Sequence, residues 1–584
     1  MNHLWIAFSL LGIGGQAPQI TLDIKDGDVV TAERTFVVKV QAKNPITQVE
    51  FYVGDDLRET DSSTPYEFHL DALSEAEGEL AVKFSAYTNQ GENASKTVKI
   101  RIDNGLSKGA DFHVGHADEL LAVSKWDDAI RACRIALKAK SDYNPARLRM
   151  ARAYMGKGVY DQAQKYAEDA LNADPNYLDA ADLLSAINLK RAFTTFHRTG
   201  EQKETLNTIG AALKAAVTNR KKILEAAVEK LEPATDANAI PYADAAIRAG
   251  RYSAAISALN GVFRRDTREA KVANRLAFAQ MRGGRFRDAM LTLTENNRQG
   301  GLDAYGWALR AVLHTLGGQY AEADDAMRQA VLSDSEDLGV RTAQTFLAIA
   351  RNRTDTLRQL ATNLKKDEGQ RSEANYYLAV LYAKLGEFSS FRDSFERCVL
   401  AEPTNYDMYV YRGNESLAQV AGGRIDEGQK SYHVAAAIMY YQTALEARPE
   451  AAEALAGLAL AYIHDKKPAE AIKYARGAVA ASPGYAAGQY VFSHTCLALE
   501  GEYRAGADAL LRSSKDGVLN NEQRERYRTM LDDAAKFGKE GQTANLTAGQ
   551  LDRTNLEGRE IPRLADAYNY FAKNGRIPLI SAPK

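Results

Sequence analysis

The pattern of apolar and polar residues changes once along the chain, near residue 105. Before that point, short segments alternate apolar and polar positions, as at Phe36, Val38 and Val40. Turn residues such as Asn44-Pro45 separate these segments. After it, apolar residues recur at intervals of three and four, which is typical of helices that bury one face. The pattern therefore predicts a mainly α protein with a small all-β domain at its amino-terminal end.

The helical part repeats with a period of 34 residues. A glycine, an aromatic residue two places later and an alanine three places after that recur from Gly250, Gly284 and Gly318. Gly386 and Phe388 hold a later place in the same register. A fixed period of this length is typical of stacked helix-turn-helix units, each of which packs on its neighbours. We therefore expect an α-solenoid of about ten units.

The clearest unit runs from Asn144 to Tyr177. Small residues at Ala151 and Ala163 allow its two helices to approach closely, and Pro175 ends the second helix. This combination of small, aromatic and proline positions resembles the tetratricopeptide repeat (TPR). The resemblance implies a concave groove, lined by the first helix of each unit, in which a protein or peptide partner binds.

The all-β segment covers residues 18–104 and is predicted to be a small sandwich of two sheets. Its stretches 49–55, 64–68 and 86–91 resemble the bacterial immunoglobulin-like (Ig-like) domain of secreted and cell-surface proteins. The resemblance implies a spacer or an adhesive module outside the cytoplasm, and it implies no catalytic residue.

The chain starts with an apolar run from Leu4 to Ile13. This run is too short to span a bilayer but is typical of the core of a signal peptide. The alternatives are an unstructured start or a first β-strand. Because an Ig-like segment follows, we expect the protein to be periplasmic, secreted or on the cell surface. No other stretch is long and apolar enough for a membrane helix.

The sequence predicts the following organisation, given by residue ranges. A signal peptide occupies 1–17, the Ig-like sandwich 18–104, TPR units 105–177, a long-helix region 178–235, TPR units 236–519 with a loop insertion near 421–432, and a C-terminal tail 520–584. The long-helix region is either one unit with lengthened helices or a hinge between two sub-arrays.

Three expectations concern the carboxyl-terminal part. The unit that starts after Ala486 is expected to turn at Gly501 and Tyr503. Residues 534–556 are rich in Gly, Thr, Asn and Gln and are expected to be flexible. Ile561–Phe571 is expected to form a helix that caps the array, because a terminal unit needs a polar outer face.

Candidate partner-binding residues follow from the TPR resemblance, by their places in two first helices. They are Leu148, Arg149, Arg152 and Met155 in one unit, and Lys271, Asn274, Arg275, Phe278 and Arg282 in the unit that starts at Ala270. Lysine, asparagine and arginine on one helix face can hold carboxylates, because arginine offers two parallel donors. The alternative is an ordinary solvated helix surface.

Composition and motifs narrow the chemistry. A formal net charge of −2 gives no argument for nucleic-acid binding. Cys133, Cys398 and Cys496 are too far apart for a zinc ribbon or a disulfide framework. His113 and His116 have a spacing that can place two imidazoles on one helix face, but no further ligand is evident. No phosphate-binding, metalloprotease or nucleophile-elbow motif occurs, so we predict no cofactor, no metal and no enzymatic activity.

The prediction is therefore a non-enzymatic scaffold that is exported and binds a protein or peptide partner in the TPR groove. One alternative is an envelope protein whose Ig-like module binds a glycan, with the TPR array as an assembly platform. The aromatic candidates for that role are Tyr52, Tyr66 and Tyr87. A third possibility is an accessory subunit of an enzyme or a secretion machine. Neither nucleic acid nor a membrane span is predicted.

Overall fold

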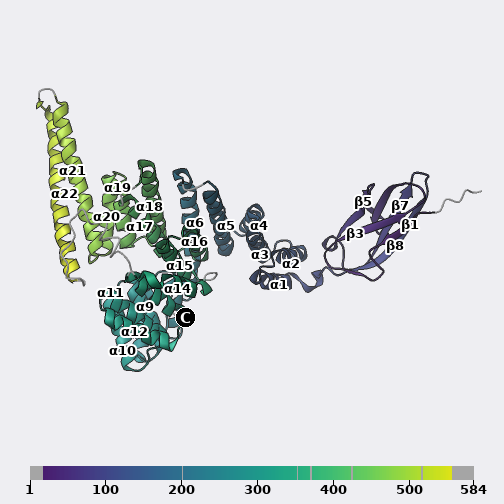
Figure 1. Ribbon diagram of the computed structural model, residues 1–584, viewed down its shortest axis with the longest axis horizontal. Helices are drawn as coiled ribbons and strands as arrows, with labels where there is room; N and C mark the ends of the chain where they lie inside the picture. The colour runs from purple at the N-terminus through teal and green to yellow at the C-terminus, as the bar shows by residue number, and fades with distance from the viewer. Residues whose placement is uncertain are drawn as a thin grey trace, which may run out of the picture. The chain divides into compact units, whose positions relative to one another are not determined.

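The computed structural model describes residues 17–199, 202–351, 353–367, 371–421, 425–514 and 517–554. They form a β-domain followed by a long series of helices (Figure 1). The chain divides into two compact units, Met1–Leu184 and Ser185–Lys584, and each is described by itself. The predicted closing helix at 561–571 and all but the last residue of the predicted signal peptide lie outside the described residues.

The β-domain is a sandwich of two sheets. Its strands are β1 (Gln19–Leu22), β2 (Val29–Val30), β3 (Glu33–Gln41), β4 (Ile46–Val53), β5 (Asp56–Asp61), β6 (Tyr66–Asp71), β7 (Gly78–Thr88) and β8 (Asn93–Ile102). One sheet has the order β1-β3-β6 and the other the order β2-β8-β7-β4-β5. All pairings are antiparallel except that of β2 with β8.

Four phenylalanine side chains fill the space between the sheets. Phe36, Phe51, Phe68 and Phe84 are fully buried, and the centroids of neighbouring rings are 5.0 to 5.7 Å apart. Each ring lies at an inward position of a different strand, between residues that are more exposed. The period of two in the sequence therefore corresponds to a β-sandwich, and this prediction is confirmed.

The first unit also contains the first helical hairpins. Its helices are α1 (Ala110–Ala122), α2 (Trp126–Ala139), α3 (Asn144–Gly156), α4 (Tyr160–Ala173) and the start of α5 (Leu178–Thr199). Ala151 and Ala163 are fully buried in the hairpin of α3 and α4, as the close approach of two helices requires. Gly158 makes the turn with a left-handed backbone (φ 78°).

Polar contacts tie the segment after β8 to the sandwich, and one ion pair joins the β-domain to the first hairpin. The side-chain amide of Asn104 donates to the carbonyl oxygens of Ala72 and Glu75, at 3.1 and 3.0 Å. Arg134 of α2 forms an ion pair of 3.1 Å with Asp71 at the end of β6. These contacts attach the sandwich directly to the helices, without a long linker.

The second unit continues the series of hairpins. Its further helices are α6 (Lys203–Glu229), α7 (Ala239–Arg248), α8 (Tyr252–Arg265), α9 (Ala270–Arg282), α10 (Phe286–Arg298), α11 (Ala304–Leu316), α12 (Tyr320–Ser333), α13 (Leu338–Ala350), α14 (Leu357–Leu364), α15 (Ser372–Leu385), α16 (Phe388–Ala401), α17 (Tyr406–Ala421), α18 (Glu427–Ala447), α19 (Ala452–His464), α20 (Pro468–Ala481), α21 (Ala486–Ser513) and α22 (Asn521–Thr554). Within the described ranges, no helix is both long and apolar enough to cross a membrane.

The 34-residue period has a direct structural cause. Gly250, Gly284, Gly318 and Gly386 all have a left-handed backbone, with φ between 68° and 76°. Such a residue ends one helix and lets the chain reverse into the next, and glycine adopts it without a steric penalty. The prediction of an α-solenoid is confirmed.

The array returns on itself within the second unit, because α6 packs against α18. Lys214 donates to Gln442 at 2.9 Å, and Thr218 donates to Glu446 at 2.8 Å, although 228 residues separate the partners in each pair. The region 178–235 consists of two lengthened helices, with 22 residues in α5 and 27 in α6.

The loop expected near 421–432 is shorter than the sequence suggested. Helix α18 begins at Glu427, and its cap residue Asp426 accepts from the backbone N–H of Gln429 at 2.8 Å. The inserted residues therefore extend α18 to 21 residues, compared with 14 in the second helix α12 of a regular unit. A cap at Asp426 stabilises this early start because it satisfies a free N–H group.

The turn expected at Gly501 and Tyr503 is wrong. Helix α21 runs without interruption from Ala486 to Ser513. Gly501 does not have the left-handed backbone of the turn glycines, and a side chain added there would meet open space. A glycine in a helix that continues on both sides does not by itself end it.

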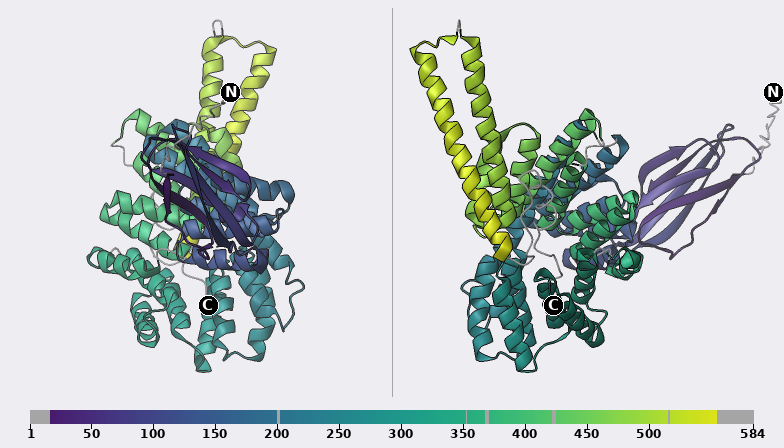
Figure 2. Two further views of the ribbon diagram at one scale, coloured as in Figure 1. Left: turned by 90° about the vertical axis from the view of Figure 1, so that its right-hand side faces the viewer. Right: turned by 60° about the vertical axis from the view of Figure 1, so that its left-hand side comes forward.

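The expectation of a flexible tail at 534–556 is also wrong for the residues that the structure describes. Helix α22 extends to Thr554 and lies antiparallel to α21 (Figure 2). Its buried positions include the small residues Ala534, Ala544 and Ala548, which give no conspicuous apolar stripe in the sequence. Small residues instead allow the two helix backbones to approach closely.

Candidate functional site

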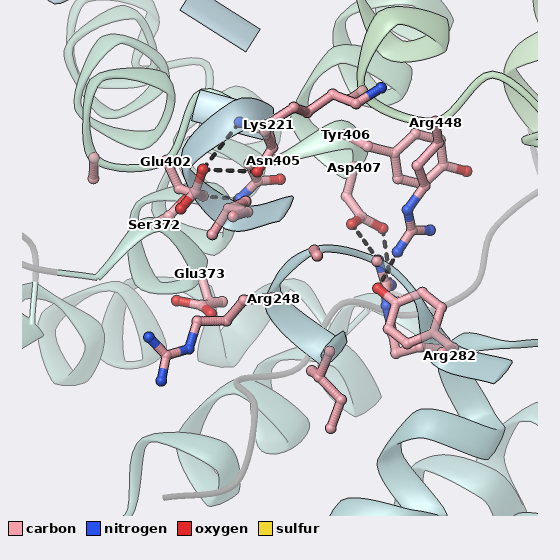
Figure 3. A pocket seen from close by; sticks show the side chains of 18 of the residues that line it. Lys221, Arg248, Arg282, Ser372, Glu373, Glu402, Asn405, Tyr406, Asp407 and Arg448 are labelled. Atoms are coloured by element: carbon pink, nitrogen blue, oxygen red, sulfur yellow. Dashed lines mark hydrogen bonds and ion pairs between the residues drawn. The ribbon is translucent and has the colours of Figure 1, made fainter. Parts of the chain in front are cut away.

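A cavity of about 300 Å³ lies in the second unit, where the array returns on itself. Its walls come from α6, the turn between α7 and α8, α9, the first turn of α15, the connection from α16 to α17, and the end of α18. Figure 3 shows the charged and aromatic side chains that surround it. A cavity of this size is at the lower end of the range for small-molecule sites.

A buried ion pair forms one side of the cavity. Arg282, in the last turn of α9, donates to both carboxylate oxygens of Asp407 at 3.1 and 2.6 Å. Both side chains are nearly inaccessible to solvent, with 3% and 9% exposed. Burial would lower the pKa of Arg282, but the carboxylate of Asp407 outweighs it and raises that pKa well above its usual value. The pair therefore stays charged and fixes α9 on α17.

Arg448, the cap residue that follows α18, stacks between two aromatic rings. Its guanidinium carbon lies 4.8 Å from the ring centre of Tyr252 and 4.6 Å from that of Tyr406. It also donates to the hydroxyl of Tyr252. Burial alone would raise the pKa of Tyr252, but the charges of Arg448 and Arg282 together lower it. Cation–π contacts of this kind are strongest where water is excluded.

Two buried carboxyl groups accompany this cluster. Glu453 of α19 is buried next to Tyr406, and burial raises its pKa to about 7 even though a hydrogen bond from Tyr406 opposes the shift. Glu373, in the first turn of α15, lines the cavity, and burial raises its pKa too. Both groups therefore hold their protons to a higher pH than an exposed glutamate does.

The rim between α15 and α17 is held by hydrogen bonds among side chains and backbone. The side-chain amide of Asn405 donates to the hydroxyl of Ser372 at 2.6 Å, and its oxygen accepts from the N–H of Met408 at 3.2 Å. Glu402 accepts from the hydroxyl of Thr404 at 2.7 Å. These bonds hold the cavity wall in a defined shape.

The groove candidates of α9 are mostly buried. Arg275 donates to both carboxylate oxygens of Asp244, at 2.7 and 3.1 Å, and Asn274 donates to Asp303 at 2.9 Å. Phe278 and Arg282 are buried as well, and both line the cavity. Lys271 is exposed. The array closes over this helix, so that the polar side chains expected to face a partner contact other parts of the chain instead.

The candidates of α3 lie in the first unit and differ in exposure. Leu148 is buried and Met155 is partly buried. Arg149 donates to both oxygens of Asp118 on α1, at 2.9 and 2.8 Å. Arg152 is exposed.

Most of the residues that shape the cavity were not found from the sequence. Asp407, Arg448 and Tyr406 belong to no local motif, because their contacts join segments far apart in the chain. Tyr252 was recognised only as the aromatic residue of the repeated turn. The sequence contains only a weak signal for this cavity. Some first helices carry a charged residue at a position where neighbouring units have an apolar one. Arg282 and Phe278 were singled out, but as groove residues.

The histidines and cysteines considered as metal ligands do not come together in the structure. Nε2 of His113 is buried and lies 2.6 Å from the carbonyl oxygen of Gly105, whereas His116 is exposed and faces Glu119. The three cysteines are buried free thiols, and burial raises the pKa of Cys133 and Cys496 to about 12. Among the residues that the structure describes, no group of three metal-binding side chains occurs.

Comparison with known protein families agrees with this architecture. Residues 120–187, 246–313 and 417–486 match the family described as tetratricopeptide repeat, and residues 18–107 match the bacterial Ig domain. The chain is a TPR protein with an amino-terminal bacterial Ig domain. The TPR matches fall on hairpins in both compact units. No curated protein matches this chain.

Several solved structures are similar to parts of it. Yeast Tom70 is 13% identical, with 76% of this chain and 98% of that chain covered and a TM-score of 0.33. A chain of the APC/C hetero-tetramer Cut9-Hcn1 is 13% identical, with 77% of this chain and 96% of that chain covered and a TM-score of 0.37. The fibronectin(III)-like modules of Clostridium thermocellum CbhA are 23% identical, with 15% and 97% covered and a TM-score of 0.14.

Proposed function

We propose that this TPR protein is an exported, non-enzymatic scaffold that binds a protein or peptide partner. TPR repeats indicate a protein–protein interaction scaffold. The observation that carries the proposal is the preformed stack of helical hairpins, which presents side chains at fixed positions. Because the scaffold is already ordered, binding of a partner requires little free energy to order it.

Two exposed cations on first helices favour an acidic partner surface. Of the groove candidates, Arg152 of α3 and Lys271 of α9 are exposed, whereas Arg149, Arg275 and Arg282 are held by carboxylates of the chain. Arg152 and Lys271 are thus the candidates best placed to meet a carboxylate of a partner.

The Ig domain acts as a spacer or a surface contact in this proposal. Bacterial Ig domains suggest an extracellular or surface location. The ion pair between Arg134 and Asp71 joins the domain to the first hairpin. Cell fractionation followed by sequencing of the mature amino terminus tests export. A full-length protein recovered only from the cytoplasm would contradict it.

The scaffold proposal is tested by capture from a source-cell envelope extract. The full chain and its Arg152→Glu/Lys271→Glu variant are used as baits, with Arg264→Glu, an exposed position on α8, as the control. We expect one dominant protein on the wild type and on the control, and its loss from the double variant. Equal capture by all three baits would show that neither Arg152 nor Lys271 contributes to capture. Arg275 is left intact because its pair with Asp244 supports the fold.

A glycan-binding Ig domain is the second candidate, and one surface cluster favours it. On the outer face of the five-stranded sheet, the hydroxyl of Tyr52 donates to Glu50 at 2.5 Å, and Gln48 donates to the same carboxylate at 2.7 Å. Tyr87 lies opposite Gln48 on β7, and its hydrogen bond with Glu50 raises its pKa. Partly exposed tyrosines next to fixed polar groups suit the apolar and polar faces of a sugar.

The third tyrosine candidate does not belong to this cluster, because Tyr66 is buried in the core of the sandwich. A glycan array probed with the full chain tests the second candidate. We expect retention that is lost in Tyr52→Ala and kept in Tyr320→Ala, a half-exposed tyrosine of the helical array. If the array retains no glycan, the Ig domain does not bind the glycans on it.

A further inference from the structure

The cavity lies where α6 packs against α18. Among the charged side chains that line it, the cations without a carboxylate partner outnumber the carboxylates without a cation. Three of its acidic side chains already form ion pairs. Asp407 pairs with Arg282, Glu225 pairs with Arg251, and Glu402 lies 3.5 Å from Arg220. These carboxylates are therefore compensated within the chain.

The cations of the cavity are compensated less completely. Arg448 is stacked on two tyrosine rings, and Lys221 donates to the backbone carbonyl of Glu446 at 2.8 Å. Within the described parts of the chain, Arg248 and Arg371 have neither an ion-pair partner nor a side-chain hydrogen bond. Glu373 is the remaining acidic group, so that four cations face one carboxyl group.

We propose that this cavity binds a small anion through a carboxylate or phosphate group, with Arg248 and Arg371 as its ligands. Arg248 ends α7, and Arg371 precedes the first turn of α15. Figure 3 shows Arg248 next to Glu373, on the opposite side of the cavity from the pair of Arg282 and Asp407. Arginine suits this role because its planar group donates two parallel hydrogen bonds to a carboxylate or a phosphate.

The surroundings fit a ligand of limited size. The cavity is about 300 Å³, which admits a small metabolite or the end of a chain but not a folded partner. Arg248 and Arg371 are exposed, so that a ligand reaches them from solvent. The hydrogen bond between Asn405 and Ser372 keeps the wall beside them in place. Burial raises the pKa of Glu373, which reduces the negative charge that an anion meets there.

This site does not depend on the partner proposed for the scaffold, because its two arginines are not among the groove candidates. Isothermal titration calorimetry on the full chain tests it, with inorganic phosphate and citrate as separate probes at low ionic strength. The variant is Arg248→Gln/Arg371→Gln, which removes two charges from exposed positions and leaves the buried pair intact. The matched control is Arg264→Gln/Arg287→Gln, which removes two charges from exposed positions outside the cavity.

We expect saturable binding of at least one probe to the wild type and to the control, and about tenfold or greater weakening in the cavity variant. Tighter binding of phosphate would identify a phosphorylated ligand, and tighter binding of citrate a carboxylate. The proposal is overturned if neither probe saturates the wild type. It is also overturned if the cavity variant and the control weaken binding equally, because the effect would then reflect net charge alone.

Discussion

Arg282 and Asp407 form a bidentate ion pair across 125 residues of sequence, and both side chains are almost completely buried. Arg282 lies in the last turn of α9 and Asp407 in the first turn of α17. Each charge is thus at the helix end that favours its sign. The pair joins two hairpins that a linear solenoid would keep apart, and so it is a main contact by which the array closes.

The first prediction is that removing one partner of this pair strongly destabilises the second unit. Asp407→Asn leaves the guanidinium of Arg282 buried without its counter-charge, and we expect a loss of about 3–5 kcal/mol in the free energy of unfolding. Urea unfolding followed by circular dichroism measures it. The control is Glu295→Gln, which breaks the exposed ion pair with Arg298 and should leave the transition within experimental error.

A double substitution separates the loss of a contact from the cost of an unpaired charge. Arg282→Met/Asp407→Leu replaces the pair by apolar side chains, and we expect it to recover much of the stability that Asp407→Asn loses. If the double variant is as unstable as the single one, the pair would contribute by its own attraction rather than by avoiding a buried charge.

The closure of the array shows what the sequence could and could not predict. The glycine turns and alanine contacts of each hairpin are local, so that a 34-residue period predicts the hairpins well. The contact of Arg282 with Asp407 depends on the total rotation that accumulates from one unit to the next along the array. No local sequence pattern determines that total. For this reason Asn274, Arg275 and Arg282 were expected to face a partner, whereas the structure pairs them within the chain.

The second prediction concerns Glu453, whose pKa is raised by burial from 4.5 to about 7. Between these values the folded state keeps a proton that the unfolded chain has lost. The stability that depends on the neutral carboxyl is therefore complete below pH 4.5 and decreases as the pH rises to about 7. The full decrease is on the order of 3 kcal/mol.

Replacing Glu453 by Gln tests this directly, because glutamine is neutral at every pH. We expect the variant to be more stable than the wild type at pH 8 and similar to it at pH 5, as measured by thermal unfolding. Glu450→Gln, an exposed change a few residues away, is the control and should follow the wild type. A wild-type profile with the same slope as that of Glu453→Gln would show that Glu453 is already ionised at neutral pH. The pKa of Glu373 is also raised, so that Glu373 lowers the stability with rising pH in the wild type and in Glu453→Gln alike.

The third prediction concerns the contact between α21 and α22. A Cβ atom at Gly541 would lie 3.1 Å from Cβ of Cys496 and 3.2 Å from the carbonyl oxygen of Ser493. The hydroxyl of Ser493 also donates to the carbonyl oxygen of Gly541 at 2.7 Å. Gly541→Leu therefore forces the two helices apart, and we expect a loss of about 1–3 kcal/mol. Hydrogen exchange should become faster over residues 521–554.

Gly501→Ala is the matched change on the partner helix. A Cβ atom there meets no atom within 4 Å, and the residue lies in the interior of α21. Alanine is more favourable than glycine in a helix by about 0.8–1.0 kcal/mol, so we expect slower exchange in α21 around this position. If Gly501→Ala instead destabilised the protein, the chain would turn at this glycine, as the repeat pattern suggested. If Gly541→Leu left exchange unchanged, α22 would not be held on α21 by close backbone packing.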